Sequence, residues 1–412
     1  MLTQQQNTTL ATHLTHKGNL KHSRYGWLRL TPAYSIHLVS QLLDALPKME
    51  AVVLDPFCGT GTTALVCSER GIPANTVDIN PFLIWLTTVK TRSYKPTELE
   101  LFDRACKTIC FAIGDDSDQS SWIPPLYKIE KWWDEKTLLA IGRMMFHIRE
   151  MESSFPHPVI DLLKIAFCRV MIECANVSFA HQSMSFKKIS GTKSLLDEQE
   201  TIVSLWYRAS MDIRNAASSM IATEPRALLC DARELTSTLP TEHYTCVITS
   251  PPYPNRMSYI RELRPYMYWL EYLQDGRQAG ELDWQAIGGT WGCATSNVGK
   301  WLPQTVRSIP YDGFETILTR IAEHSSLLSR YVHKYFYDMV EHINDLFRIM
   351  KSGGIAHYIV GNSKFYDVLL PVEQIFSALF NAAGFENVSI DTLRKRTSKK
   401  ELYEYIVTAT KP

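Results

Sequence analysis

Residues 51–63 read Ala-Val-Val-Leu-Asp-Pro-Phe-Cys-Gly-Thr-Gly-Thr-Thr, and this stretch decides the predicted fold. An apolar run enters a turn with two glycines, Gly59 and Gly61, and residues 64–70 continue with the pattern of a helix. Glycine permits a sharp turn and lets the backbone come close to a ligand. A strand, a glycine-rich turn and a helix in this order are typical of phosphate loops, dinucleotide-binding folds and S-adenosylmethionine sites.

The residues that follow the glycines argue against two of these three kinds of site. A phosphate loop needs Gly-Lys-Ser or Gly-Lys-Thr, and a dinucleotide fold usually carries a third spaced glycine, whereas Thr62 and Thr63 follow here. Residues 74–78 predict a second strand that ends in an acid, Asp78. Its distance from the first motif suits a carboxylate that binds ribose hydroxyls. Asp78 could instead cap the helix that follows.

A second motif, Thr249-Ser250-Pro251-Pro252-Tyr253-Pro254, follows a β-branched and aromatic run that predicts a buried strand over residues 244–248. Two adjacent prolines fix their own φ angles, so the chain leaves this strand in one rigid shape. That shape places Ser250, a main-chain carbonyl and the ring of Tyr253 around one small space. The space suits an extruded nucleobase that presents its amino group. The same residues could also form a simple strand-ending turn.

Taken together, these segments resemble the amino-methylating DNA methyltransferases of restriction–modification systems. These enzymes use S-adenosylmethionine to modify the N4 of cytosine or the N6 of adenine. The family's cofactor motif, D-P-F-x-G-x-G-T-T, stands intact at residues 55–63, and its catalytic motif, (Asp/Asn/Ser)-Pro-Pro-(Tyr/Phe/Trp), stands at residues 250–253. An aromatic-rich segment at residues 22–34 matches the region near the cofactor's methionine end, and Asp231 matches the acid near its adenine ring.

The resemblance implies an α/β fold, a Rossmann-like, doubly wound and mostly parallel sheet of the class I methyltransferase type. The S-adenosylmethionine-binding catalytic domain is expected over residues 20–95 and 225–412. In residues 96–224 the strand signals fade and helical spacing takes over, which predicts a mainly helical insertion and a candidate target-recognition region. The irregular stretch 280–310, with its Gly-Gly-Thr-Trp-Gly run, is a candidate DNA-contacting loop.

Residue patterns also predict the elements of the C-terminal part. An amphipathic helix is expected over residues 338–350, followed by a strand over 355–363. A further helix over 372–383 and a final strand over 402–408 complete the sheet.

The resemblance assigns roles to individual residues. Those expected to hold S-adenosylmethionine are Tyr25, Thr31, Pro32, Asp55, Pro56, Phe57, Cys58, Gly59, Thr60, Gly61, Thr62, Asp78, Ile79, Asp231 and Ala232. The catalytic residues would be Ser250, Pro251, Pro252 and Tyr253. The Ser250 hydroxyl and the Pro251 carbonyl would accept hydrogen bonds from the amino group, and Tyr253 would stack on the flipped base. No covalent nucleophile is required, and the Pro-Cys motif of cytosine C5 methylation does not occur in the sequence.

The choice of base stays open between two amino groups. Serine before Pro-Pro is commoner among N4-cytosine enzymes and favours cytosine, whereas adenine N6 is the alternative. The cofactor motif precedes the catalytic motif here, which departs from the order of many N4-cytosine enzymes. An RNA methyltransferase and a non-catalytic nucleic-acid-binding protein on the same fold are further alternatives. No nuclease motif stands out, so any cognate restriction endonuclease would be encoded separately.

Charge and composition limit which partners the protein can bind. The chain has 43 Lys and Arg and 43 Asp and Glu residues, so binding to double-stranded DNA needs locally concentrated positive charge. The candidate DNA contacts are Arg256, Arg261, Lys187, Lys188, Trp291, Arg394 and Arg396. The nine cysteines form no metal-binding pattern, so no metal is expected. The sequence shows neither a signal peptide nor a run of eighteen apolar residues, which predicts a cytoplasmic protein away from membranes.

Overall fold

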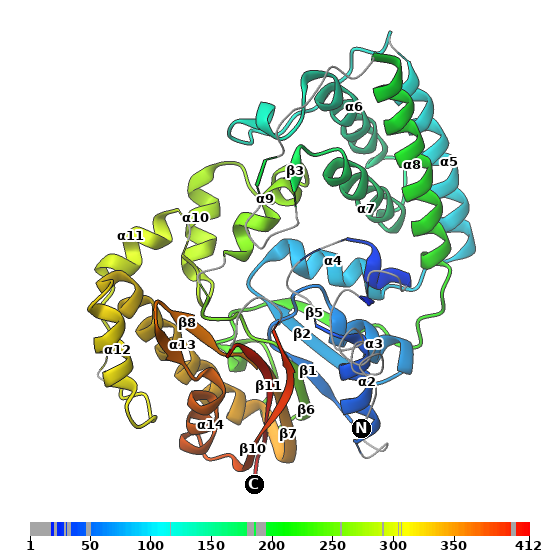
Figure 1. The fold of residues 1–412 in the computed structure, drawn as a ribbon. Helices are drawn as coiled ribbons and strands as arrows, with labels where there is room; N and C mark the ends of the chain where they lie inside the picture. The colour runs from blue at the N-terminus through cyan, green and yellow to red at the C-terminus, as the bar shows by residue number, and fades with distance from the viewer. Residues whose placement is uncertain are drawn as a thin grey trace, which may run out of the picture.

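A seven-stranded sheet organises the molecule, with strand order β10-β11-β7-β6-β1-β2-β5 (Figure 1). In the computed structural model, the described residues are 18–19, 23–28, 30, 34–46, 51–115, 117–178, 185–186, 195–255, 258–290, 292–303, 305, 307–396 and 401–412. The strands of the sheet are β1 (Val53–Asp55), β2 (Ala74–Asp78), β5 (Arg226–Leu229), β6 (Tyr244–Thr249), β7 (Met350–Gly361), β10 (Glu386–Lys395) and β11 (Tyr403–Thr410).

Strand directions identify the fold. Strands β5, β2, β1, β6 and β7 pair in parallel, and β11 is antiparallel to both of its neighbours, β7 and β10. A mostly parallel sheet with one reversed strand beside the last strand is the arrangement of class I methyltransferases. The predicted Rossmann-like fold is therefore confirmed.

Helices cover both faces of the sheet because its central strands are apolar on both sides. Val53 and Cys246 pack with the residues of α2 (Ile36–Asp44) and α3 (Thr62–Arg70) in one core cluster. Their strand neighbours Leu54 and Val247 pack on the other side, since successive side chains of a strand point to opposite faces. That second cluster contains residues of α13 (Ser326–Ile349) and α14 (Val372–Ala382).

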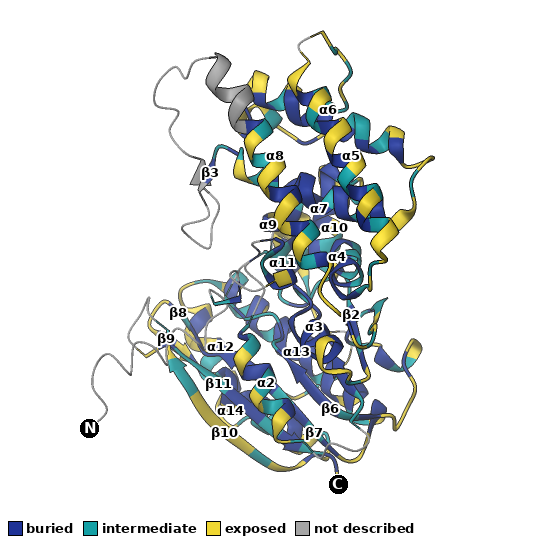
Figure 2. Cartoon of the chain, turned by 90° about the vertical axis from the view of Figure 1, so that its right-hand side faces the viewer, coloured by how far each residue is buried: buried dark blue, intermediate teal, exposed yellow. Residues whose placement is uncertain are grey.

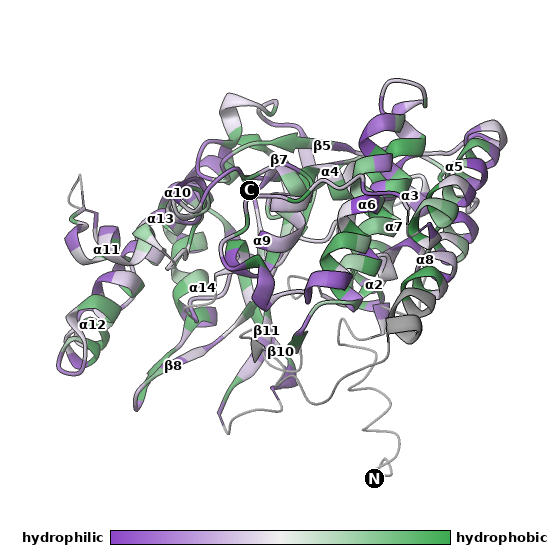
Figure 3. Ribbon diagram, turned by 90° about the horizontal axis from the view of Figure 1, so that it is seen from above, coloured by the Kyte–Doolittle hydropathy of each residue, from purple (hydrophilic) through white to green (hydrophobic). Residues whose placement is uncertain are grey.

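Residues 96–217 contain a group of helices that lies beside the sheet (Figure 1). Its helices are α5 (Pro96–Gly114), α6 (Glu135–Met151), α7 (His157–Glu173) and α8 (Leu195–Ala217), with a two-stranded pair, β3 (Val177–Ser178) and β4 (Ser185–Phe186). Trp133, Trp206 and Trp269 are fully buried in one core cluster with α4 (Pro81–Thr91). Apolar and polar bands alternate around α6, α7 and α8, as expected for amphipathic helices (Figure 3).

A buried arginine connects the helices of residues 96–217 to the rest of the molecule. Arg24 is fully buried, and its guanidinium donates to the carbonyls of Lys90 at 2.9 Å and Arg92 at 2.6 Å, just at the end of α4. It also donates to the carbonyls of Ala217 at 2.7 Å and Ser219 at 2.9 Å, at the end of α8. The same cation thus satisfies the last carbonyls of α4 and α8.

The segment after β6 is more helical than the sequence predicted. It contains α9 (Tyr259–Trp269), α10 (Gly276–Gln285), α11 (Cys293–Lys300) and α12 (Phe314–Ala322), so the expected loop over 280–310 includes a helix. The helix predicted over 338–350 is the end of α13, which begins twelve residues earlier. Strand β10 was not predicted, and its residues are exposed along most of its length (Figure 2). The remaining short elements are η2 (Ser23–Gly26), η3 (Ile129–Lys131), η4 (Leu235–Ser237), β8 (Ser363–Phe365) and β9 (Val368–Leu370).

Candidate active site

The ends of four parallel strands bring the two motifs to one edge of the sheet. Val53 of β1 pairs with Cys246 of β6, and Leu54 pairs with Val247. Parallel strands end at the same edge, so the turn that follows β1 lies beside the turn that follows β6. The ends of β2 and β5, the strands next along the sheet, lie at this edge as well. Ligands of doubly wound sheets bind at this carboxyl edge.

Two positions of the turn after β1 require glycine. Its backbone is tied down, because the amide of Cys58 donates to the carbonyl of Val77 at 2.9 Å. Gly59 and Gly61 have φ angles of 51° and 75°, which side chains rarely adopt. A Cβ on Gly61 would lie 2.5 Å from the hydroxyl oxygen of Thr87. The turn is therefore rigid, with bare backbone packed against α4.

Asp55 connects the two motifs directly. One of its carboxylate oxygens accepts a hydrogen bond from the Thr249 hydroxyl at 2.6 Å and another from the Phe57 amide at 3.1 Å. The other oxygen accepts from the Tyr34 hydroxyl at 2.9 Å. Asp55 is fully buried, and this burial raises its pKa to about 7, against the effect of the three donors.

Two further charged groups hold the glycine turn. The carboxylate of Asp78 accepts from the Gly59 amide at 3.2 Å and from the Asn80 amide at 2.9 Å. Burial raises the pKa of Asp78 to about 6. From α4, the ammonium of Lys90 donates to the Thr60 carbonyl at 3.0 Å, and burial lowers the pKa of Lys90 to about 8. No sequence motif marks Lys90.

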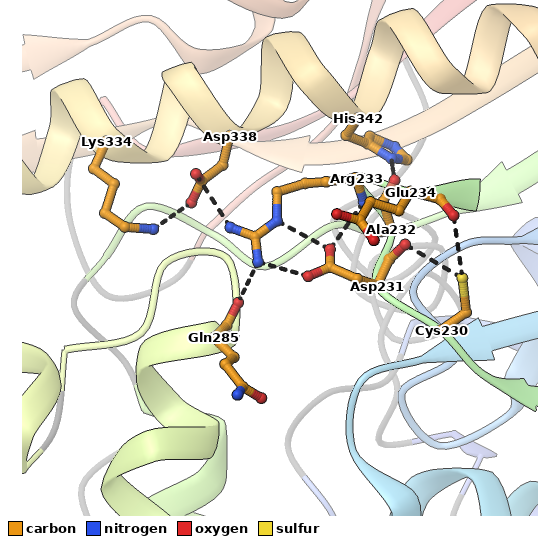
Figure 4. A network of polar contacts seen from close by, with 9 residues as sticks. All are labelled: Cys230, Asp231, Ala232, Arg233, Glu234, Gln285, Lys334, Asp338 and His342. Carbon is orange, nitrogen blue, oxygen red and sulfur yellow. Dashed lines mark hydrogen bonds and ion pairs between the residues drawn. The ribbon is translucent and has the colours of Figure 1, made fainter. Parts of the chain in front are cut away.

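A charged network surrounds the residues after β5 (Figure 4). The guanidinium of Arg233 donates to both carboxylate oxygens of Asp231, at 3.0 and 2.6 Å. Arg233 also pairs with Asp338 of α13 at 3.3 Å, and Lys334 pairs with Asp338 at 2.6 Å. Burial would raise the pKa of Asp231, but the hydrogen bond and charge of Arg233 outweigh it and lower that pKa. Asp231 is consequently an ionised acid in a fixed orientation.

A neutral histidine completes this side of the site. His342 lies 2.7 Å from the Ala232 carbonyl through Nδ1 and 2.6 Å from the Tyr358 hydroxyl through Nε2. Burial lowers the pKa of His342 to about 4. Because the carbonyl can only accept, Nδ1 carries the proton and Nε2 accepts from the tyrosine. The ring of Phe57 contacts this imidazole edge-on, with 4.8 Å between ring centres.

The turn after β6 is built from neutral groups. The Ser250 hydroxyl donates to the Ile359 carbonyl of β7 at 3.0 Å. Its proton is thereby engaged, so the oxygen presents lone pairs to a ligand. The Pro252 carbonyl accepts from the Tyr335 hydroxyl of α13 at 2.7 Å.

The ring of Tyr253 is packed from behind. It is half-buried, and a Cβ on Gly361 would lie 2.9 Å from its Cε2. The guanidinium carbon of Arg396 lies 5.7 Å from the ring centre, within the range of a cation–π contact. Arg396, predicted as a DNA contact, thus stands next to the catalytic turn.

Other predicted residues are placed differently. The hydroxyl of Tyr25 donates to Glu69 at 2.7 Å, in the last turn of α3, whereas the glycine turn adjoins the first turn. The hydrogen bond of Tyr25 is thus at the far end of α3 from the glycine turn. Tyr34 of the same aromatic segment donates to Asp55 instead. Pro56 and Ile79 lie in the turns after β1 and β2, and Thr62 is the first residue of α3.

The predicted DNA contacts are spread over the chain. Arg261 is exposed in the first turn of α9. Arg394 forms a two-pronged ion pair with Glu404 of β11, at 2.6 and 2.7 Å. The predictions for Thr31, Pro32, Lys187, Lys188, Arg256 and Trp291 lie outside the described residues.

Within the described ranges, no group of three or more His, Cys, Asp or Glu side chains could hold a metal ion. None of the described helices is both long and apolar enough to cross a membrane.

The strand order and the two turns at the carboxyl edge give the protein the fold of class I methyltransferases. It is similar to the type II methyltransferase M.AvaI of Nostoc sp., with 24% identity over 401 residues that cover 90% of this chain and 81% of that protein. It is also similar to M.BsoBI of Geobacillus stearothermophilus, with 22% identity and coverage of 95% and 85%. These relatives confirm the predicted resemblance to DNA methyltransferases of restriction–modification systems.

A shorter part of the chain is similar, at higher sequence identity, to the type II methyltransferase M.MjaII of Methanocaldococcus jannaschii. It reaches 39% identity over 135 residues, which cover 32% of this chain and 25% of that protein. No protein-family model matches the chain. A solved rRNA methyltransferase, aviRa from Streptomyces viridochromogenes, aligns with 95% of the chain at 10% identity and a TM-score of 0.28, so the strand order itself carries the fold assignment.

Proposed function

We propose that this chain is a site-specific DNA methyltransferase that transfers a methyl group to the exocyclic N4 of a flipped cytosine. The hydrogen bond from Ser250 to the Ile359 carbonyl carries the proposal. It makes the serine oxygen an acceptor, and an acceptor is what an amino group requires. The names of the relatives, all type II methyltransferases, support DNA as the substrate.

The residues at the edge of the sheet fit S-adenosylmethionine as the methyl donor. The glycine turn lies at the carboxyl edge of the sheet, where ligands of such sheets bind, and the Asp78 carboxylate at the end of β2 suits ribose hydroxyls. Phe57, Asp231 and Ala232 are grouped around Arg233 and His342, and would hold the adenine side. When bound, the cofactor supplies an electrophilic methyl group on its sulfonium sulfur.

The catalytic turn would act on the amino nitrogen by hydrogen bonding. This nitrogen is conjugated to its ring and is a poor nucleophile. The Ser250 oxygen would accept one N–H, and the Pro251 carbonyl would accept the other. Both bonds draw electron density onto the nitrogen and orient its lone pair. Holding the two reacting groups in line can supply several kcal/mol of the barrier, on the order of 7 for well-aligned groups.

The Tyr253 ring would stack on the flipped base and offset part of the cost of extrusion. Its packing against Gly361 and Arg396 suits this role, because a ring fixed in advance loses little freedom when the base arrives. A water molecule or a nearby acceptor then takes the proton released from the amino group. No ionisable group of the turn has to change its charge during transfer.

Adenine N6 is the second candidate, since adenine presents the same kind of amino group. The serine before Pro-Pro favours cytosine. An RNA methyltransferase and a non-catalytic nucleic-acid-binding protein are less well supported, given the relatives' names and the intact hydrogen bonds of both turns.

Double-stranded DNA is the proposed partner, with a separately encoded restriction endonuclease as a further one. Arg261 and Arg396 remain proposed contacts to the phosphate backbone, because both lie close after or beside the catalytic turn. Arg256, Lys187, Lys188 and Trp291 remain proposals from the sequence alone.

Expression in a host without DNA methylation tests the function. Sequencing that separates 4-methylcytosine from 6-methyladenine should show 4-methylcytosine at one recurring DNA sequence. The Ser250→Ala variant, expressed at the same level, is the negative control. Only 6-methyladenine would move the proposal to adenine, and no modified base in the wild-type sample would refute a DNA methyltransferase.

A further inference from the structure

A tyrosine outside both motifs contacts the catalytic turn. Tyr335 belongs to α13, is 1% exposed, and donates its hydroxyl to the Pro252 carbonyl at 2.7 Å. Its ring is fixed on two sides: Phe336 meets it edge-on with 5.0 Å between ring centres, and a Cβ on Gly288 would lie 3.5 Å from its Cδ2. The hydroxyl therefore has little freedom to leave the carbonyl.

The direction of the Pro252 carbonyl depends on the ψ angle of Pro252, a backbone torsion that the two proline rings do not fix. In Ser-Pro-Pro-Tyr, each proline ring locks its own φ near −65°. The ψ angle of Pro252 is not locked by the ring, and it sets the direction in which the chain enters Tyr253. A rotation about this bond turns the Pro252 carbonyl with it. A hydrogen bond to that carbonyl therefore restrains ψ and, with it, the direction in which the backbone of Tyr253 leaves the turn.

Burial keeps the tyrosine in its donor form. It raises the pKa of Tyr335 well above the usual value of a phenol. A carbonyl can only accept, so the neutral hydroxyl is the matching partner. The group thus holds the turn without introducing a charge beside the amino group of the base.

The same face of α13 also holds the cofactor side. Asp338 and His342 follow Tyr335 by three and seven residues, which places them on one side of a helix. Asp338 pairs with Arg233 at 3.3 Å, and His342 contacts the Ala232 carbonyl at 2.7 Å. Side chains of one helix therefore contact both the turn after β6 and the residues after β5.

We propose that Tyr335 is a positioning residue for methyl transfer, which sets the ψ angle of Pro252 and thereby aligns Tyr253 with the flipped base. This inference rests on the proposed function. Tyr335 touches neither base nor cofactor in this scheme, and acts through the turn.

The Tyr335→Phe variant removes a single oxygen and keeps the packed ring. We expect its kcat on DNA to fall about 10- to 100-fold, with the cofactor Kd and the KM for DNA within about threefold of wild type. Tyr337→Phe is the matched control on the same helix, where the lost hydroxyl bonds Thr305 at 2.9 Å. Its kcat should stay within about twofold of wild type.

A double-mutant cycle separates positioning from general loosening of the fold. If Tyr335 acts through Tyr253, adding Tyr335→Phe to the Tyr253→Ala variant should lower kcat by less than about threefold. A full 10- to 100-fold loss in that background would overturn the inference, and so would an unchanged kcat of Tyr335→Phe alone. Loss of cofactor binding in Tyr335→Phe would mean a structural role. A wild-type protein that does not methylate DNA would instead refute the proposed function itself.

Discussion

The two turns at the carboxyl edge of the sheet follow neighbouring strands, yet they are built from different groups. The glycine turn after β1 is held by ionisable side chains, namely Asp55, Asp78 and Lys90. The catalytic turn after β6 is held by neutral hydroxyls and carbonyls, through Ser250 and Tyr335. In the proposed function, ionisable groups suit the first turn because the ribose hydroxyls of the cofactor would bind a carboxylate. Neutral acceptors suit the second, because an amino group needs polarisation without a competing ion.

The strongest test of this comparison is Ser250→Ala. It removes the acceptor and should lower kcat about 10²- to 10³-fold, the range seen when one preorganised hydrogen bond to a reacting group is lost. The cofactor Kd, measured by calorimetry, should stay unchanged, because the glycine turn keeps its own contacts. Ser237→Ala, which also removes a hydroxyl that donates to a carbonyl, is the control. A weakened cofactor affinity in Ser250→Ala would show that the turns are not functionally separate.

The second prediction concerns the charge on Asp55. Its folded pKa of about 7 lies above the ordinary value of 3.8, so the folded state binds more protons between these two pH values. The free energy of unfolding contributed by Asp55 therefore falls as pH rises from about 4 to about 7, by up to about 1.4 kcal/mol for each pH unit. Asp55→Asn cannot titrate and lacks this fall.

Denaturant unfolding at several pH values measures the effect. At pH 4 the Asp55 carboxyl of the folded protein is protonated and neutral, like the amide of Asp55→Asn, so the two proteins should be closest in stability there. Towards pH 7 the wild type should lose stability relative to the variant. His342 has a pKa lowered to about 4, which makes stability rise with pH in the same window. That opposite effect is common to both proteins, so the difference between them isolates Asp55, and a constant gap would contradict the prediction.

The third prediction tests the ribose role of Asp78. Asp78→Ala should raise the cofactor Kd about 10- to 100-fold, the effect of losing hydrogen bonds to a charged group. At saturating cofactor its kcat should remain within about threefold of wild type, since the catalytic turn is untouched. Asp44→Ala, at an exposed carboxylate paired with Arg70, is the control. An unaltered cofactor affinity would remove Asp78 from the binding site.

The same contrast explains which parts of the site could be predicted from sequence. Both turns are encoded by contiguous residues: Gly61 is required by its φ of 75° and by the contact with Thr87, and Ser-Pro-Pro-Tyr restricts its own backbone. The supporting groups are not contiguous. Tyr34, Lys90 and Tyr335 occupy ordinary positions in the sequence, and only tertiary packing brings them to the turns.

Two errors in the fold prediction have similar causes. Strand β10 is largely exposed, so it lacks the apolar alternation that marks a half-buried strand. In the stretch 280–310, the helix α11 lies within the expected loop, and the glycines there have another explanation than ligand approach. A Cβ on Gly289 would lie 1.6 Å from the Asp283 carbonyl oxygen, so this glycine is explained by a tight turn after α10. A glycine in the sequence can mark a close contact with the chain's own backbone or a close contact with a ligand, and the sequence alone does not distinguish the two.

The smallest expected effect compares two arginines at the end of β10. Arg394 is paired with Glu404 through two hydrogen bonds, whereas no ion pair joins Arg396 to a carboxylate within the described residues. Arg396 also lies beside the Tyr253 ring. If Arg396 contacts a DNA phosphate, Arg396→Ala should weaken DNA binding a few-fold and reduce the slope of log K against log salt by about 1. Arg394→Ala, measured in the same salt titration, should leave the slope unchanged because its charge is already neutralised within the chain. Equal slopes for the two variants would remove Arg396 from the DNA interface and leave it as a support for the catalytic ring.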